Sequence, residues 1–261
     1  MQEPQSMMER GIVRVSNMAK SFGGRTAIED ISFEVNDGEV VAIAGESGSG
    51  KSTLLRCIAG ALQPSAGSVS IRVGAQFEDV YSLPAERRRL LMRTAWGLVD
   101  QDARAGLRMN LSAGANIVER LLVRGIHRYD VLREDAERWF DAVALPRDRI
   151  DDLPSTFSGG MLTRLQLARV LVSGPGVVLL DEPTGGLALS VQATILDLIR
   201  RLNQRLRVAV VLVTHDLAVA RLLAPRMLVM HDGRVVESGL TDQIIDDPIH
   251  PYTQLLVSSM L

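Results

Sequence analysis

One nine-residue stretch constrains the fold of this 261-residue chain more than any other feature. Residues 45–53 read Gly-Glu-Ser-Gly-Ser-Gly-Lys-Ser-Thr and fit the pattern G-x-x-x-x-G-K-[ST]. An apolar run at residues 40–44 precedes the pattern, and a helix is expected over residues 51–60. The sequence therefore predicts a glycine-rich loop held between a buried strand and a helix.

Each residue type in this loop has a physical role in holding an anion. Glycines let the backbone turn tightly and point successive N–H groups inward, and the N-terminus of the following helix also favours negative charge. Lys51 is expected to reach the β- and γ-phosphates of a nucleotide, and Ser52 to bind Mg²⁺. The predicted nucleotide-binding residues of the loop are Gly45, Glu46, Ser47, Gly48, Ser49, Gly50, Lys51, Ser52 and Thr53.

Composition excludes several classes of protein. The chain is 46% hydrophobic, enough for a sizeable core, and its net charge of −2 gives no overall electrostatic case for nucleic acid. A single cysteine, Cys57, excludes an intramolecular disulfide and suits a reducing compartment. Residues 1–10 lack the apolar core of a signal peptide, and apolar runs such as residues 208–213 are too short to cross a membrane. We expect a cytoplasmic protein without direct membrane insertion.

The pattern of elements predicts an α/β fold. From residue 177 onward, apolar strands alternate with helices, which is typical of parallel βαβ units. Closely spaced strands before the loop predict an antiparallel β layer, and helical periodicity marks a helical insert near residues 102–160. The expected fold is one domain, 1–261, with a mainly parallel core sheet, an antiparallel β layer and that helical subdomain.

Two further strand ends carry polar residues suited to phosphoryl transfer. The apolar run at residues 177–180 ends in Asp181 and Glu182, and we expect this strand to lie beside the strand that enters the loop. Asp181 suits Mg²⁺, directly or through water, and Glu182 suits a base that orients or deprotonates water. His215 follows the next strand and could donate a hydrogen bond to the γ-phosphate. Alone, an acidic strand end or a single histidine is more often purely structural.

A second anion-binding nest is predicted at Ser158, Gly159 and Gly160, at the start of a helix. The plainer interpretation is a helix cap, because serine is a favourable N-cap residue. One domain seldom builds two nests for one nucleotide. The pattern therefore favours a dimer in which each nest closes over the nucleotide held by the other subunit.

Together these motifs resemble those of ABC-type ATPases over nearly the whole chain. The resemblance implies that residues 45–53 form the Walker A loop, residues 177–182 the Walker B strand and residues 158–160 the signature motif. It implies that Glu182 is the catalytic glutamate, His215 the switch histidine and Gln101 the glutamine that touches Mg²⁺. It also implies that Phe22 stacks on adenine. The implied ligands are ATP and Mg²⁺, with Ser52, Gln101 and Asp181 at the metal, and the implied activity is ATP hydrolysis.

A narrower resemblance is to the ATP-binding, K-type subunits of phosphonate carbon–phosphorus lyase systems. It rests on four segments, residues 150–160, 214–221, 235–242 and 250–259. It implies a subunit of phosphonate metabolism acting on a soluble lyase core, with a second copy of itself as partner. The His-Pro-Tyr sequence at residue 250 also occurs in ATPases of dipeptide and oligopeptide importers, whose partner is a membrane permease, but those usually continue well beyond it. A third alternative is an ATP-dependent clamp with little turnover.

Two positions depart from the pattern of the ABC family. Met161 stands where the signature usually continues with glutamine, and Ala188 stands where the family has an acid that links the two subunits and helps position water. We therefore expect intact ATP binding with weakened hydrolysis or weakened coupling across the dimer, unless neighbouring backbone compensates.

An arginine-rich stretch at residues 86–93 falls outside these motifs. It reads Glu-Arg-Arg-Arg-Leu-Leu-Met-Arg and predicts an amphipathic helix. Three interpretations stay open: a solvated helix face, a docking face for an acidic partner, and contact with nucleic acid, which no interleaved aromatic residues support.

Overall fold

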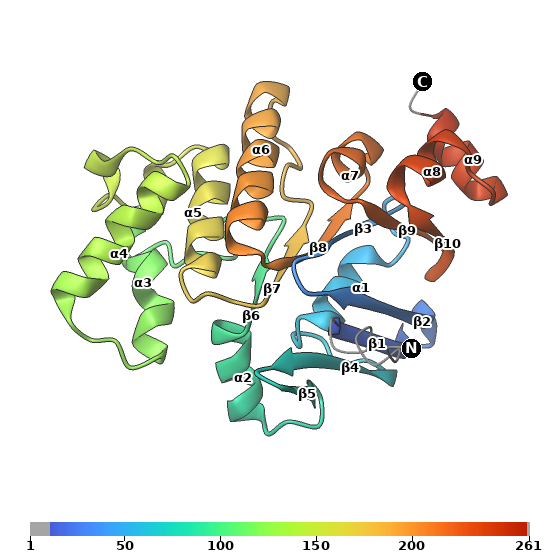
Figure 1. Cartoon of the computed structure of the whole chain (residues 1–261), viewed down its shortest axis with the longest axis horizontal. Coiled ribbons are helices and arrows are strands. Elements are labelled where there is room, and N and C mark those ends of the chain that lie inside the picture. The colour runs from blue at the N-terminus through green and yellow to red at the C-terminus, as the bar shows by residue number, and fades with distance from the viewer. Residues whose placement is uncertain (1–10, 260–261) are drawn as a thin grey trace, which may run out of the picture.

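The computed structural model describes residues 11–259, which form two β-sheets surrounded by helices (Figure 1). The strands are β1 (Gly11–Phe22), β2 (Arg25–Asn36), β3 (Val40–Ala44), β4 (Ala66–Val73), β5 (Gln76–Asp79), β6 (Trp96–Val99), β7 (Val177–Asp181), β8 (Ala209–Thr214), β9 (Arg226–His231) and β10 (Arg234–Leu240). The helices are α1 (Lys51–Ile58), α2 (Ala85–Thr94), α3 (Ala113–Val123), α4 (Tyr129–Ala142), α5 (Gly159–Leu171), α6 (Leu189–Leu206), α7 (Leu217–Leu223), α8 (Thr241–Asp246) and α9 (Pro251–Ser258), with short 3₁₀ turns η2 (Arg147–Arg149) and η3 (Pro154–Thr156). Residues 1–10, on which the expectation of no signal peptide rests, lie outside the described part.

The larger sheet has six strands in the order β10-β9-β3-β8-β7-β6. Its strands are parallel except β10, which pairs antiparallel with β9. One expectation was wrong: β7 does not lie beside β3, because β8 lies between them. Alternating strands and helices predict that strands are parallel but not their order, since a crossover can leave room for a later strand. The carboxyl ends still share one edge, and Asp181 reaches across it to Ser52.

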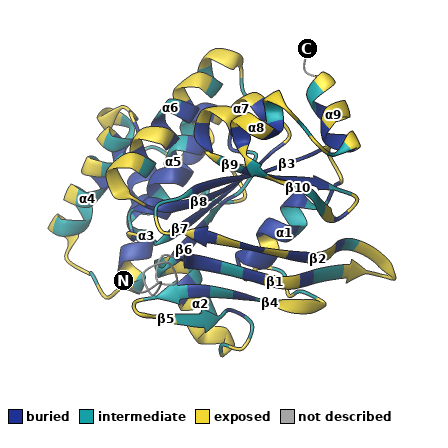
Figure 2. Cartoon of the chain, turned by 45° about the vertical axis from the view of Figure 1, so that its right-hand side comes forward, coloured by how far each residue is buried: buried dark blue, intermediate teal, exposed yellow. Residues whose placement is uncertain are grey.

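Alternating side chains of the central strands build two cores, one on each face of this sheet. Val41 and Ile43 of β3 point into the core that contains α1 and the antiparallel sheet. Ala42 and Ala44 point into the core formed with helices α5, α6 and α7. Both β3 and β7 are buried along their whole length, which explains their uninterrupted apolar sequences (Figure 2). Helix α1, which follows the glycine-rich loop, is therefore held firmly between the two sheets.

The smaller sheet is antiparallel, in the order β2-β1-β4-β5. The register between its first two strands, β1 and β2, shifts at several points, which breaks the regular alternation of side chains. Asn17 and Asp30 adopt positive φ at these irregular points and bond to each other through their side chains at 2.9 Å. The short strand β5 was missed because its sequence, Gln-Phe-Glu-Asp, is largely polar.

The remaining elements follow the predicted pattern closely. Strands β9 and β10 form a hairpin, and its turn residues Asp232 and Gly233 both have positive φ, the conformation that Asp-Gly turns favour. Helices α3 and α4 pack against α5 at the end of the molecule away from α8 and α9 (Figure 1). Within residues 11–259, no helix has both the length and the apolar character that crossing a bilayer requires.

Candidate active site

A large cavity of about 1020 Å³ opens at the carboxyl edge of the six-stranded sheet. Residues that follow neighbouring strands meet there: the loop after β3, Gln101 after β6, Glu182 after β7 and His215 after β8. This is where parallel α/β sheets usually bind ligands. The residues lining the cavity are Phe22, Arg25, Thr26, Ala27, Gly45, Glu46, Ser47, Gly48, Gly50, Lys51, Ser52, Thr53, Gln101, Glu182, His215, Asp232, Gly233 and Leu256.

At two positions of the glycine-rich loop, any side chain would collide with a neighbouring segment of backbone, a different one at each position. A Cβ atom on Gly45, which has φ +148°, would lie 2.2 Å from the carbonyl oxygen of Met230. A Cβ on Gly50, with φ +100°, would lie 2.5 Å from the carbonyl oxygen of Ala27. Backbone from β9 and β2 therefore packs directly against the loop and leaves no room for a side chain at these two positions.

Lys51 is nearly buried beneath this loop and is bonded to it. Its Nζ donates to the carbonyl oxygens of Gly45 at 2.7 Å and Glu46 at 2.6 Å. Burial lowers the pKa of Lys51, while nearby carboxylates, Glu182 first among them, oppose the shift. The charge is thus held in place at the wall of the cavity, where the oxygens of a phosphate can join its hydrogen bonds.

Ser52 and Asp181 bring two side-chain oxygen atoms together next to Lys51. Ser52 Oγ donates to Asp181 Oδ1 at 2.8 Å, and the Asp181 residue is only 2% exposed. Burial raises the pKa of Asp181, and the hydrogen bond from Ser52 offsets part of that shift. A nearby cation would favour the ionised form. Hydroxyl and carboxylate oxygens suit Mg²⁺, which keeps several water or phosphate ligands. Consistent with that, no cluster of three or more His, Cys, Asp or Glu in residues 11–259 forms a metal cage by itself.

Glu182 and His215 are paired across the mouth of the cavity. His215 Nδ1 and Glu182 Oε1 are 2.9 Å apart, with 11% of the Glu182 side chain exposed and 65% of the His215 side chain. Glu182 adopts φ +47°, and its backbone N–H bonds the carbonyl of Val213 at 3.0 Å. A positive φ at a non-glycine residue costs energy, so neighbouring strands hold this carboxylate in an uncommon conformation. The arrangement gives a carboxylate and an imidazole that face the same space as Lys51.

The predicted second nest does not belong to the same cavity. Ser158 caps α5 by accepting a hydrogen bond from the Met161 N–H at 3.4 Å, as the plainer interpretation expects. A Cβ on Gly160 would lie 2.5 Å from the Val191 side chain, so this glycine also allows α5 and α6 to pack closely. Ser158 and Gly159 are exposed and do not line the cavity around Lys51. Within a single chain, the two nests therefore stay apart.

Phe22 is half exposed at the rim of the cavity, and Lys20 Nζ lies 5.1 Å from its ring centre. The C-terminal helix α9 also reaches this region, which sequence reasoning missed. Tyr252 Oη accepts a hydrogen bond from the Glu46 N–H at 3.0 Å and its ring stacks on His231. The His-Pro-Tyr sequence was the available signal, but nothing in it predicts contact with a loop 206 residues away.

The two departures from the family pattern, Ala188 and Met161, lie at the N-terminal ends of helices α6 and α5. Ala188 is the N-cap of α6 and makes no capping hydrogen bond, and its side chain is exposed. Met161 is partly buried, and its Sδ lies 3.9 Å from Arg149 Nη1. Neither residue lines the cavity around Lys51.

Comparison with known proteins identifies the family. The model of the ABC transporter family matches residues 28–185. The chain is 52% identical to the putative phosphonates utilization ATP-binding protein PhnK of Escherichia coli, over 97% of this chain and 99% of that protein. It is 35% identical to a putative peptide import ATP-binding protein of Brucella ovis, over 97% of this chain and 80% of that protein.

Solved structures agree with this result. A dimeric, post-hydrolysis structure of the ATP-binding cassette MJ0796 bound to ADP and Pi superposes with a TM-score of 0.79 at 29% identity, covering 88% of this chain and 99% of that one. CbiO1 of Clostridium perfringens, part of the ABC transporter complex CbiONQ, gives 0.78 at 27% identity, with 92% of each chain covered. The expected fold is confirmed, and the chain belongs to the ABC transporter family of ATPases.

Proposed function

We propose that the chain is the ATP-binding and ATP-hydrolysing subunit of a phosphonate carbon–phosphorus lyase system, working in the cytoplasm on a soluble lyase core. The observation that carries this proposal is the 52% identity to PhnK, which extends over 97% of the chain. The chain itself would do no carbon–phosphorus chemistry, because one cysteine does not provide the thiolate set of an iron–sulfur site.

In this proposal the cavity around Lys51 holds ATP. The N–H groups of the loop and the Lys51 ammonium bind the phosphates, and Phe22 packs on the adenine. Ser52, Asp181 and Gln101 hold Mg²⁺, which when bound neutralises charge on the phosphate oxygens. Glu182 orients the attacking water and accepts its proton, and His215 holds the Glu182 carboxylate and donates to the γ-phosphate.

The working unit in this proposal is a dimer of two copies of the chain. Ser158, Gly159 and Gly160 lie apart from the cavity of their own chain, so they would bind the ATP held by the partner subunit. The dimeric state of the related MJ0796 cassette supports this arrangement. The N-terminus of α5, where Ser158 and Gly159 are exposed, supplies the chemistry for such a contact.

Two other functions have specific support. Identity of 35–36% to peptide-import and di/tripeptide transport proteins favours an importer ATPase that acts on a membrane permease. Ala188, which cannot supply the acid usual at that position, favours an ATP-dependent clamp with little turnover.

Affinity purification distinguishes these functions. The tagged chain is recovered from its own cells, starved of phosphate and supplied with methylphosphonate, and the proteins that co-elute are identified. We expect lyase core subunits, recovered better with Mg²⁺ and a non-hydrolysable ATP analogue. A Lys51→Ala variant is the control, because its recovery should not respond to the nucleotide. Co-elution of a membrane permease instead would contradict the proposal, and tight ATP binding without measurable turnover would favour the clamp.

A further inference from the structure

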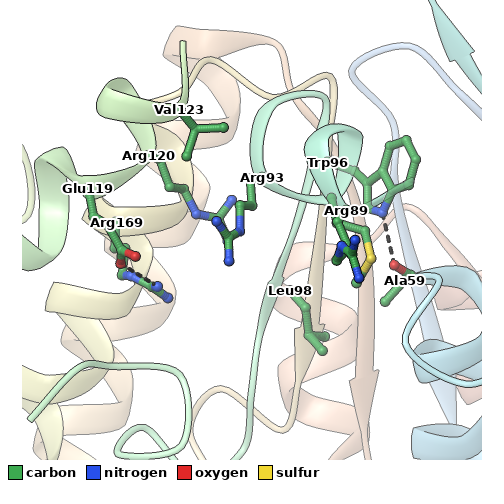
Figure 3. Close-up of a pocket in the computed structure, with 10 residues that line it drawn as sticks. Ala59, Arg89, Arg93, Trp96, Leu98, Glu119, Arg120, Val123 and Arg169 are labelled. Carbon is green, nitrogen blue, oxygen red and sulfur yellow. Dashed lines mark hydrogen bonds and ion pairs between the residues drawn. The ribbon is translucent and has the colours of Figure 1, made fainter. Parts of the chain in front are cut away.

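A second cavity, of about 280 Å³, lies where helix α2 and strand β6 face helices α3 and α5. Four arginines line it, together with one carboxylate and an apolar wall that includes Trp96, Leu98 and Val123 (Figure 3). The arginines come from three helices: Arg89 and Arg93 from α2, Arg120 from α3 and Arg169 from α5. None of them lines the cavity around Lys51.

Arg120 is the most deeply buried of these charges. The residue is only 8% exposed, and its Nε and Nη1 atoms are buried without a hydrogen bond to any residue in the range 11–259. Burial lowers the pKa of Arg120 to about 10, and the positive charge of Arg169 adds to the effect. A buried, unpaired guanidinium is costly and rare, because such groups normally carry a counter-ion.

The carboxylate of the cavity, Glu119, offsets the shift in the Arg120 pKa only in part. Glu119 already forms ion pairs with Arg169 at 2.9 Å and with Arg108 at 2.6 Å. Arg89 and Arg93 lie one helical turn apart on α2, exposed, and neither makes an ion pair or hydrogen bond with another described residue. Three of the four arginines that line the cavity are therefore free to bind a ligand.

The backbone is shaped to admit the Arg120 side chain. Figure 3 shows it extending from α3 toward Arg93, with the Glu119–Arg169 pair to one side. A Cβ on Gly97 of β6 would lie 3.1 Å from Arg120 Nη1 and 2.3 Å from Val170, so glycine at this position keeps the space open. The guanidinium thus faces a cavity that a small group can enter.

We propose that this arginine cavity is a binding site for a small free oxyanion, with a phosphate, phosphonate or carboxylate head held by Arg120 at its base and by Arg93 and Arg89 at its rim. Guanidinium groups bind such heads through paired, charge-assisted hydrogen bonds. The small volume fits a free molecule of this size better than a segment of a partner protein. Only the use of methylphosphonate as a probe rests on the proposed function.

Calorimetric titration of the full chain tests the site. Excess ADP and Mg²⁺ are added to occupy the glycine-rich loop. Binding of ADP is measured in a separate titration, so that a failure of the proposed nucleotide site is distinguished from a failure of the arginine cavity to bind an anion. Inorganic phosphate, methylphosphonate and acetate are the probes, at constant ionic strength set with chloride. We expect saturable binding of at least one probe. Fluorescence provides a second readout, because Trp96 lines the cavity and the chain has one other tryptophan, Trp139, which a Trp139→Phe background removes.

Variants connect the binding to the cavity. Arg93→Gln should weaken it by about tenfold, the loss of one charge-assisted contact, and Arg120→Met should abolish it. Arg87→Gln is the matched control, because Arg87 lies on the same helix but pairs with Glu78 at 2.9 Å. Without added anion, Arg120→Met should melt at a higher temperature than the wild type, whereas loss of a merely structural arginine would lower it. The absence of saturable binding, or equal binding in wild type, Arg93→Gln and Arg120→Met, would overturn the proposal.

Discussion

The two cavities of this molecule each contain a buried positive charge, but they differ in how that charge is hydrogen-bonded. Beneath the glycine-rich loop, Lys51 is bonded at 2.6–2.7 Å by carbonyl oxygens of its own loop. In the arginine cavity, Arg120 is almost as deeply buried, and its Nε and Nη1 atoms make no hydrogen bond with any residue that the structure describes. The carbonyls of Gly45 and Glu46 lie close enough to accept from Lys51, whereas no described residue accepts from the Nε or Nη1 atom of Arg120. A buried cation at a binding site can therefore either already be hydrogen-bonded to the protein or be unpaired before a ligand binds.

The largest effect is expected from removing the carboxylate that faces Lys51. Glu182→Gln keeps the shape of the side chain and its place at the end of β7 but cannot accept a proton. Because a positioned general base contributes roughly 10²–10⁴-fold, steady-state ATP hydrolysis should fall by about that factor. ATP affinity should stay near the wild-type value. Glu134→Gln, on the exposed face of α4, is the control, and a variant at position 182 that hydrolyses ATP at the normal rate would remove Glu182 from the mechanism.

Replacing Lys51 tests most directly whether a hydrogen-bonded buried charge and an unpaired one affect stability differently. Lys51→Met should weaken binding of ATP by roughly 10- to 150-fold, since a hydrogen bond to a charged group contributes about 1.5–3 kcal/mol. It should also lower the melting temperature of the ligand-free protein, because the carbonyls of Gly45 and Glu46 lose their donor. Arg120→Met should shift that temperature in the opposite direction. The same sign for both variants would break the comparison, and Arg201→Met, at an exposed pair with Asp197, provides the baseline.

Sequence reasoning found the first cavity because its residues follow strands. Gly45, Glu182 and His215 each come directly after a largely apolar strand, and parallel strands bring such positions to one edge whatever the strand order. For this reason Asp181 still meets Ser52, although β3 and β7 are not neighbouring strands as expected.

The arginine cavity gave no comparable signal. Its charges are spread over residues 89–169 on three helices, and which face of a helix meets another helix depends on packing that the sequence does not reveal. The arginine-rich stretch at residues 86–93 predicts an amphipathic helix but not the role of each arginine. Arg87 pairs with Glu78, whereas Arg93 lines the cavity. Tyr252 was missed for a similar reason, because its partner is a backbone N–H far along the chain.

A smaller effect is expected at the contact between α9 and the loop. Tyr252→Phe keeps the ring that stacks on His231 but removes the oxygen that accepts the Glu46 N–H. One hydrogen bond contributes about 1 kcal/mol, so ATP affinity should fall by about fivefold if the bond holds the loop in its binding shape. Calorimetric titration with ATP measures this, with Tyr129→Phe, 78% exposed, as the control. Unchanged affinity together with a lower melting temperature would show that the bond stabilises α9 alone.

The smallest effect, and the most informative about turnover, is expected at Ala188. This residue has the extended backbone of an N-cap, with φ −61° and ψ 145°, but no side chain that can accept from the first N–H groups of α6. Ala188→Asp should raise the free energy of unfolding by about 1 kcal/mol through capping. If the missing acid also limits hydrolysis, the ATPase rate should rise as well. Ala188→Asn separates these effects, because asparagine caps a helix equally well without a charge and should raise stability alone. Equal ATPase rates in the wild type and both variants would show that the alanine at this position does not restrain turnover, and that neighbouring backbone supplies what the acid supplies elsewhere in the family.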